Sequence, residues 1–177
     1  MSVKVEHYEN GQIQSIKSIN EEGQYHNPNG PAIQRWFENG QEECREYWID
    51  GKYHDPHGPT YQEWYKNGQE KCREYRVEGR LHNSEGPALQ IWHENGQEKC
   101  REYWFNGERH NPNGPARQEW YDNGREMYRE YRLKGVRLTK KEFNQYHNTI
   151  EVTCNGKSVR INKSLDLDGL LNSKNFI

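Results

Sequence analysis

The sequence has few residues that could fill a core. Only 31% of its 177 residues are hydrophobic, and its mean hydropathy is −1.40. Such values are typical of disordered chains. Aromatic residues nevertheless make up 12% of the sequence and recur at fixed spacing. The composition therefore favours one thin, repetitive, aromatic-rich domain with room for a small appendage.

The sequence also lacks an excess of charge of one sign and any long apolar run. Its 25 Lys and Arg residues oppose 27 Asp and Glu residues, which gives no electrostatic reason to bind nucleic acid or anionic lipid. No segment approaches the roughly 20 apolar residues of a membrane-spanning helix, and the opening "MSVKVEHYENGQ" contains no apolar signal segment. We therefore expect a cytoplasmic protein.

Cysteine is scarce and regularly placed. Cys44, Cys72 and Cys100 occupy the same position of a repeat, and Cys154 stands apart. A single thiol per repeat in a reducing compartment predicts small, buried and reduced side chains instead of a disulfide framework.

An internal repeat of about 28 residues dominates the sequence. Asn-Gly recurs at 39–40, 67–68, 95–96 and 123–124, and each Arg of the repeat is followed by Glu. A degenerate unit with Asn10-Gly11 precedes the four full ones. The same interval separates three further columns: Trp36, Trp64, Trp92 and Trp120; Tyr47, Tyr75, Tyr103 and Tyr131; and Arg45, Arg73, Arg101 and Arg129.

Each unit reads as β-hairpins. Strand-like segments "AIQRWFE" and "QEECREYWI" flank Asn39-Gly40, a strong hairpin signal, and a second turn follows at Asp50-Gly51. The pattern predicts an all-β fold over residues 1–138. We expect a single-layer, elongated antiparallel meander of tandem hairpin repeats, followed by a small α+β cap over 139–177.

The expected register places the repeated columns on one face. A two-residue loop with both residues at positive φ would put Trp36 opposite Glu43 and Gln34 opposite Arg45. Trp36, Arg45 and Tyr47 would then share a face that is nearly the same in every unit, with the Arg45 guanidinium over the Trp36 ring.

The opposite face changes from unit to unit, which favours it as the surface for a partner. Aromatic side chains are enriched in the residues that dominate binding energy. The candidates for a protein-binding face are Phe37, Trp48, Tyr61, Tyr65, Trp104 and Tyr121. The leading hypothesis is a non-enzymatic scaffold for protein–protein interaction or assembly.

The arginine column offers an alternative function. Arg45, Arg73, Arg101 and Arg129 would form a row, and the Glu residues that follow them would lie on the other face. Such a row could bind an anionic ligand or a membrane surface. Neighbouring Gln and Tyr side chains could instead satisfy these guanidiniums, which makes this alternative the less favoured one.

Histidine recurs in the motif His-x-x-x-Gly-Pro at His26, His54, His82 and His110. Equivalent residues of successive units would lie two strands apart, about 10 Å, too far to share a metal ion. No unit adds a second ligand or a nucleophile at suitable spacing. We therefore expect these histidines to anchor turns, and we expect no catalytic, cofactor-binding or metal-binding residues.

These motifs resemble the MORN-repeat proteins (membrane occupation and recognition nexus). The closest pattern is a variant whose units read Tyr/Trp-x-x-Asn-Gly…His-x-x-x-Gly-Pro-Ala, as in "EWYKNGQEKCREYRVEGRLHNSEGPA" (63–88). The resemblance covers residues 7–138 and looks like the tandem copies in large DNA viruses of amoebae, some phages and bacteria. It implies a single-layer antiparallel scaffold or binding surface, here acting in a host cytoplasm or a virion.

The two ends depart from the repeat. Val3, Val5 and His7 replace the usual pattern at the first strand, as expected of a cap. At the other end, Thr139 and Glu142 predict a capping box for a short helix over about 140–147. A hairpin on Asn155-Gly156 and an aliphatic tail follow, the tail containing Leu165, Leu167, Leu170, Leu171, Phe176 and Ile177. The tail would be a cap or a docking surface, and a homodimer could form through it or through a sheet edge.

Overall fold

The computed structural model describes residues 1–55, 57–154 and 157–162. The chain divides into two compact units, Met1–Arg137 and Leu138–Ile177. The predicted tail, from Leu165 onward, lies outside the described residues.

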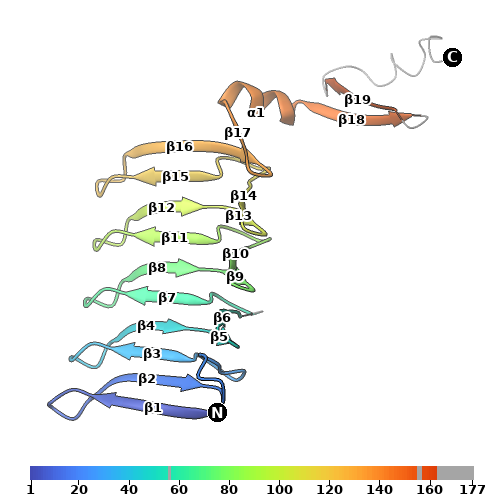
Figure 1. Cartoon of the computed structure of the whole chain (residues 1–177). Helices are drawn as coiled ribbons and strands as arrows, with labels where there is room; N and C mark the ends of the chain where they lie inside the picture. Colours follow the sequence, from blue (N-terminus) through green and yellow to red (C-terminus); the bar gives the residue numbers. More distant parts are fainter. Residues whose placement is uncertain (56, 155–156, 163–177) are drawn as a thin grey trace, which may run out of the picture. The chain divides into compact units, whose positions relative to one another are not determined.

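The predicted meander is confirmed. One antiparallel sheet contains eleven strands, and its spatial order follows the chain order throughout (Figure 1). Its strands are β1 (Ser2–His7), β2 (Ile13–Ile19), β3 (Ile33–Trp36), β4 (Glu42–Glu46), β7 (Tyr61–Trp64), β8 (Glu70–Glu74), β11 (Leu89–Trp92), β12 (Glu98–Glu102), β15 (Arg117–Trp120), β16 (Glu126–Leu133) and β17 (Val136–Leu138).

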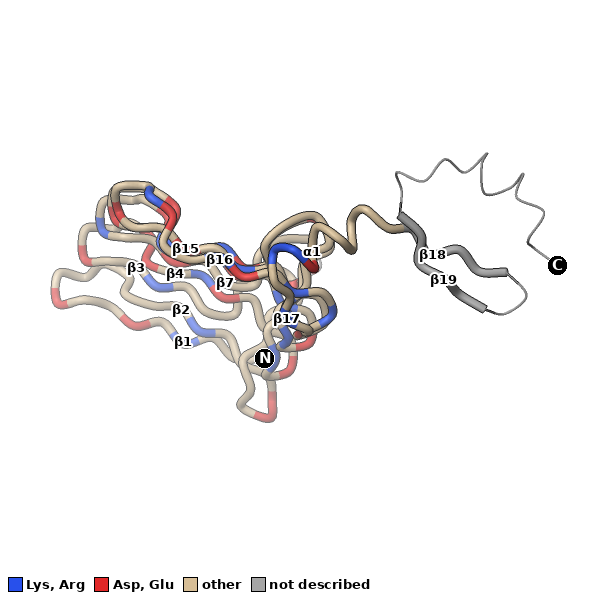
Figure 2. The backbone as a smooth tube through the Cα atoms, turned by 90° about the horizontal axis from the view of Figure 1, so that it is seen from above, with Lys and Arg blue, Asp and Glu red and all other residues tan. Residues whose placement is uncertain are grey.

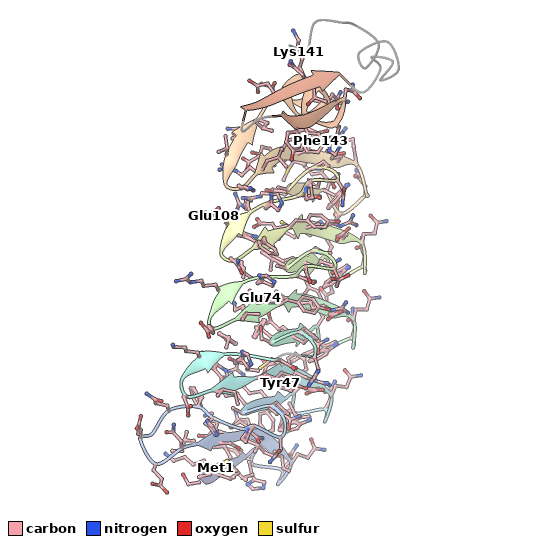
Figure 3. The ribbon with its side chains drawn as sticks, turned by 90° about the vertical axis from the view of Figure 1, so that its right-hand side faces the viewer. Met1, Tyr47, Glu74, Glu108, Lys141 and Phe143 are labelled. Atoms are coloured by element: carbon pink, nitrogen blue, oxygen red, sulfur yellow. The ribbon has the colours of Figure 1, made fainter. Side chains whose placement is uncertain are left out.

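In the fourth full unit the second turn joins β16 to β17 of the long sheet, whereas in the first three it builds a separate structure. Short hairpins form there as two-stranded sheets of their own, and they lie in a column at one end of the long strands. They are β5 (Trp48–Ile49) with β6 (Lys52–Tyr53), β9 (Arg76–Val77) with β10 (Arg80–Leu81), and β13 (Trp104–Phe105) with β14 (Glu108–Arg109). Figure 3 views the sheet from this end.

The Asn-Gly turns are correctly located, but the prediction of their geometry was wrong. The Gly40 N–H donates to the Phe37 carbonyl at 2.8 Å, and the Phe37 N–H donates to the Gln41 carbonyl at 2.8 Å. Gly40 has φ +81°, whereas Asn39 does not have a positive φ and accepts the Gln41 N–H on its side chain. The loop is therefore a type I turn closed by a glycine bulge.

This turn shifts the register by one residue near the tip of each long hairpin. Trp36 lies opposite Glu42, where a two-residue loop would have put Glu43, while Gln34 remains opposite Arg45 as predicted. Paired positive φ values occur instead in the short hairpins, for example at Asp50 (46°) and Gly51 (72°). Tight turns of that kind require them.

Burial is concentrated in a few small or charged residues, as the polar composition requires. Ala32, Ala88, Ala116 and Thr60, which follow the Gly-Pro of each linker, are all at most 1% exposed. Cys44, Cys72 and Cys100 are buried and unpaired, as predicted.

The second unit contains the predicted helix and hairpin. Helix α1 (Lys140–His147) begins with a capping box, in which the Glu142 N–H donates to the Thr139 hydroxyl and the Thr139 N–H donates to the Glu142 carboxylate. Strands β18 (Thr149–Cys154) and β19 (Lys157–Asn162) pair antiparallel. Within the described residues, no helix is long and apolar enough to cross a membrane.

Candidate functional site

The long sheet has two chemically different faces. Successive pairings place one ladder of residues on the first face, which we call the Arg–Trp face: Gln34, Arg45, Gln62, Arg73, Gln90, Arg101, Gln118 and Arg129. The other face, which we call the Glu–Cys face, carries Cys44, Cys72 and Cys100 with Glu46, Glu74, Glu102 and Glu130. Positions of Lys and Arg are interspersed with positions of Asp and Glu along the backbone of the sheet (Figure 2).

Every arginine of the Arg–Trp face is paired with a glutamate three residues earlier. The Arg45 Nε and Nη2 donate to the two Glu42 oxygens at 3.1 and 2.5 Å. Equivalent two-pronged pairs join Glu70 to Arg73, Glu98 to Arg101 and Glu126 to Arg129. Such pairs are geometrically specific and stronger than single hydrogen bonds between neutral groups.

A second bulge, in the second strand of each long hairpin, makes these pairs possible. In a regular strand, residues three apart point to opposite faces. Because Glu43 is the extra residue of the bulge, Glu42 and Arg45 reach the same face. The Gln34 amide also donates to Glu42, at 3.3 Å.

Three of the four arginines, all but Arg129 of the last unit, lie over the tryptophan of the following unit. The Arg45 guanidinium is 4.9 Å from the Trp64 ring centroid. The corresponding distance is 5.4 Å both for Arg73 over Trp92 and for Arg101 over Trp120. The predicted contact between Arg45 and Trp36 of the same hairpin is therefore replaced by a contact between units. The stacking ties neighbouring repeats together.

The tyrosine column shares this face, as predicted. The hydrogen bonds that Arg45 donates to Glu42 raise the pKa of Arg45 above its usual value, burial opposes that shift, and Tyr47 adds to it. Tyr75 acts in the same way on the pKa of Arg73.

On the Glu–Cys face, buried carboxylates connect the long strands to the short hairpins. Glu46 is 6% exposed and accepts hydrogen bonds from the Trp48 indole at 3.1 Å and the Tyr53 hydroxyl at 2.7 Å. Burial and the bond to Glu46 raise the pKa of Tyr53.

Glu102 has the same position two units later. It is 4% exposed, and the Trp104 indole donates to it at 2.8 Å. Arg109 donates two further hydrogen bonds, and Arg117 lies 3.3 Å away.

The residue two positions after each glutamate of this column is either Trp or Arg, and in every unit it donates a hydrogen bond to that glutamate. Trp48 and Trp104 donate to the glutamate two residues earlier through the indole, whereas Arg76 and Arg132 do so through Nε. Burial raises the pKa of Glu130, but hydrogen bonds from Arg132 and Tyr128 outweigh it and hold that pKa below its usual value. The alternation of Trp and Arg therefore preserves a donor to the carboxylate of each unit.

The six candidate partner-binding residues form two groups. Trp48, Tyr61 and Trp104 are half-buried beside the buried glutamates, and Trp48 stacks on Tyr53 at 3.7 Å between ring centroids. Burial raises the pKa of Tyr61.

Phe37, Tyr65 and Tyr121 belong to the second group, at the tips of the long hairpins. The Tyr65 hydroxyl donates to the Trp92 carbonyl of the next unit at 2.9 Å. Tyr121 is 41% exposed beneath the Arg125 guanidinium, at 5.0 Å. The structure therefore does not bring the six residues together into one patch.

Three of the four recurring histidines, all but His54, anchor turns through their side chains as predicted. The Nδ1 atoms of His26, His82 and His110 accept the main-chain N–H groups of Asp50, Asn106 and Lys134 at 3.0–3.2 Å. Asp50, Asn106 and Lys134 have positive φ values. The imidazoles therefore stabilise a conformation that non-glycine residues rarely adopt. Among the residues with described side chains, no three His, Cys, Asp or Glu side chains gather as a metal site would require.

Two grooves lie between successive His-x-x-x-Gly-Pro loops and were not anticipated from the sequence. One has a volume of about 450 Å³ and is lined by Tyr75, Val77 and His82, and the next has a volume of about 280 Å³ and is lined by Tyr103, Phe105 and His110. Val77 and Phe105 are 43% and 45% exposed. The Phe105 ring lies 4.7 Å from His82 and 6.3 Å from His110, between centroids. An apolar residue between two recurring histidines is the signal that could have found these grooves.

No protein-family model, curated protein or solved structure matches this chain. The functional argument therefore depends on the geometry of its own surfaces.

Proposed function

We propose that this protein is a non-enzymatic repeat scaffold that binds protein partners along the column of loop grooves. One observation carries the proposal. Side chains that recur in every unit are occupied by contacts within and between units, whereas exposed apolar side chains differ from unit to unit. Val77 and Phe105 line the grooves in this way, and Tyr121 and Met127 are similarly exposed at a hairpin tip.

The grooves suit a partner that lies across several units. They recur from one unit to the next, each offering an apolar side chain beside a histidine and a polar loop. Apolar and aromatic residues surrounded by polar groups are typical of the centres of protein interfaces. The resemblance to MORN-repeat scaffolds points in the same direction.

Binding of an anionic ligand or a membrane surface by the arginine row is supported less well. The four arginines are bound by Glu42, Glu70, Glu98 and Glu126, so the Arg–Trp face carries as many of these carboxylates as guanidiniums. An anion would have to displace a bidentate carboxylate from each. Strong co-sedimentation with anionic vesicles at physiological salt, lost in Arg73→Ala, would favour this alternative instead.

A capture experiment tests the groove. Wild-type protein, Phe105→Glu and the control Gln14→Glu, which makes the same charge change at an exposed position of β2, are immobilised and exposed to extract from the source cells. We expect one set of proteins to be retained by wild type and Gln14→Glu and lost by Phe105→Glu, with equal melting temperatures. Equal retention by all three proteins contradicts binding through the groove.

A further inference from the structure

The first strand of the sheet has an open edge. Among the described residues, β1 pairs with β2 and with no other strand, and all six of its residues are exposed. Figure 1 shows β1 at the end of the stack. At the opposite edge, β17 has three residues. A six-residue open edge without proline is a template for pairing with another strand.

The main-chain groups of Val3 and Val5 point outward from this edge. Ser18 donates its N–H to Ala32, and its carbonyl accepts from His26, so both of its groups point away from β1. Val3 lies opposite Ser18 and Val5 lies opposite Ile16. In an antiparallel pair the hydrogen-bonding direction alternates along the strand, so the N–H and C=O groups of both valines point away from β2.

Symmetry limits how two copies could pair through these groups. A two-fold axis perpendicular to the sheet keeps each face on its own side, so a valine must lie opposite a valine or another residue of the same face. Three registers place a valine opposite a valine: Val3 opposite Val3, Val3 opposite Val5, and Val5 opposite Val5. A further shift to Val5 opposite His7 would put Glu6 opposite Glu6 of the other copy, which is unfavourable.

The charges of β1 select among these registers. With Val3 opposite Val5, Lys4 would face Lys4 of the other copy, which is unfavourable. With Val3 opposite Val3, Lys4 would face Ser2. With Val5 opposite Val5, Lys4 of each copy faces Glu6 of the other, which makes two opposite-charge pairs.

The apolar side chains fit the same register. Val5 is 46% exposed and lies opposite Ile16 within its own chain. Across the two-fold axis it would meet its own copy, so that Ile16, Val5 and their counterparts form one continuous apolar row on the Arg–Trp face side of the sheet.

We propose that two copies of this chain pair antiparallel through β1, with Val5 opposite Val5 and Lys4 opposite Glu6, so that their sheets become one. This interaction does not depend on the binding of another protein by the loop grooves. Contact between two strands is smaller than the roughly 1,000 Å² typical of stable interfaces, so the dimer is weak and depends on concentration.

Charge exchange tests the register. Sedimentation of the full chain over a range of concentrations should show the wild type passing from monomer to dimer. Lys4→Glu would put a carboxylate opposite Glu6 in both of the symmetric pairs, and Glu6→Lys would put an ammonium group opposite Lys4 in both. Each should raise the dissociation constant about tenfold or more, and the double variant Lys4→Glu/Glu6→Lys should restore dimerisation.

Folding can be separated from pairing in these variants. Lys4 lies opposite Lys17 in its own chain, so Lys4→Glu replaces a repulsion and should not lower the melting temperature. Glu6→Lys loses the bonds of Glu6 to Ser15 and Lys17 and should melt earlier. A wild type that stays monomeric, or a Lys4→Glu variant that dimerises as well as wild type, overturns the proposal.

Cross-linking provides an independent test, with Cys154→Ser throughout so that the remaining native thiols are the buried ones. In Val5→Cys the two introduced thiols would lie on residues about 5.5 Å apart between Cα atoms, within disulfide reach. In the control Val3→Cys they would be about 13 Å apart along the strands. Mild oxidation by diamide should give covalent dimers of Val5→Cys only. Dimers of Val3→Cys instead, or of neither variant, would overturn the proposed register.

Discussion

The two faces of the long sheet use the same kind of residue in opposite ways. In strand β12, Glu98 binds Arg101 of its own strand on the Arg–Trp face, and its side chain is 18% exposed. Glu102 lies on the Glu–Cys face with a 6% exposed side chain, and its donors come from β13, β14 and β15. One carboxylate closes a local pair, and the other joins four strands.

This difference explains how so polar a chain can hold a single-layer sheet together. On the Arg–Trp face, stability comes from a ladder of repeated contacts, each between neighbours. On the Glu–Cys face, the short hairpins are attached to the sheet by hydrogen bonds to buried carboxylates. We therefore expect substitutions on the two faces to differ in size and in pH dependence.

The largest expected effect is that of Glu102→Ala. It removes the buried acceptor of the Trp104 indole and one of the two carboxylates beside each of Arg109 and Arg117. We expect the free energy of unfolding to fall by about 3 kcal/mol. The matched change on the other face, Glu98→Ala, should cost about 1 kcal/mol, because Arg101 can turn to solvent. Urea denaturation of both variants measures the difference. Equal losses would show that the Glu–Cys face is no more tightly coupled than the Arg–Trp face.

The next effect concerns stacking between units. Arg73→Ala should lower the free energy of unfolding by about 1–2 kcal/mol, because it removes both the pair with Glu70 and the contact with Trp92. A double-mutant cycle should give a coupling of about 0.5–1 kcal/mol between Arg73 and Trp92. The same cycle with Trp64, the tryptophan of the same hairpin, is the control. Coupling to Trp64 alone would contradict the inter-unit contact.

Most of the long sheet could be predicted from sequence because its determinants are local and repeated. Asn39-Gly40 and its equivalents place the reversals, and alternation places Gln34 opposite Arg45. The capping box at Thr139 is likewise a local signal, and the helix begins where that signal puts it.

The remaining features depend on geometry that residue types alone do not specify. Asn-Gly is compatible with two turn types, and the bulged one moves Glu42 to the face of Arg45. Alternation assigned Glu42 to the opposite face, so the partner of every arginine was missed. Similarly, the variation from Trp48 to Arg76 suggested a free surface, because only the fold reveals that both side chains donate to a glutamate of the Glu–Cys face.

The buried thiols make the Glu–Cys face sensitive to alkali. Burial raises the pKa of Cys72 from 9.0 to about 12. The unfolded chain releases this proton near pH 9 whereas the folded chain retains it, so the stabilisation is complete below pH 9 and falls as the pH rises from 9 toward 12. Between pH 8 and 10, wild type should lose about 1 kcal/mol more than Cys72→Ala. Arg73→Ala, on the other face, should keep the wild-type slope, and a changed slope there would contradict the assignment to the thiol.

The smallest effect should come from acid on the Arg–Trp face. The hydrogen bonds from Arg129 hold the pKa of Glu126 below its usual value, so this pair stabilises the fold above the unfolded pKa of about 4.5. That contribution is lost as the pH falls through the lower folded pKa. The Glu126 and Arg129 side chains are 27% and 46% exposed, so solvent screening limits the contribution to about 0.5 kcal/mol. Glu126→Gln should therefore cost this amount at pH 6 and almost nothing at pH 3, and added salt should shrink the difference.

Glu130→Gln, in the same strand but buried on the Glu–Cys face, should cost more at pH 6 and respond less to salt. Equal salt responses of the two variants would mean that the two faces do not differ in solvent access as the structure indicates.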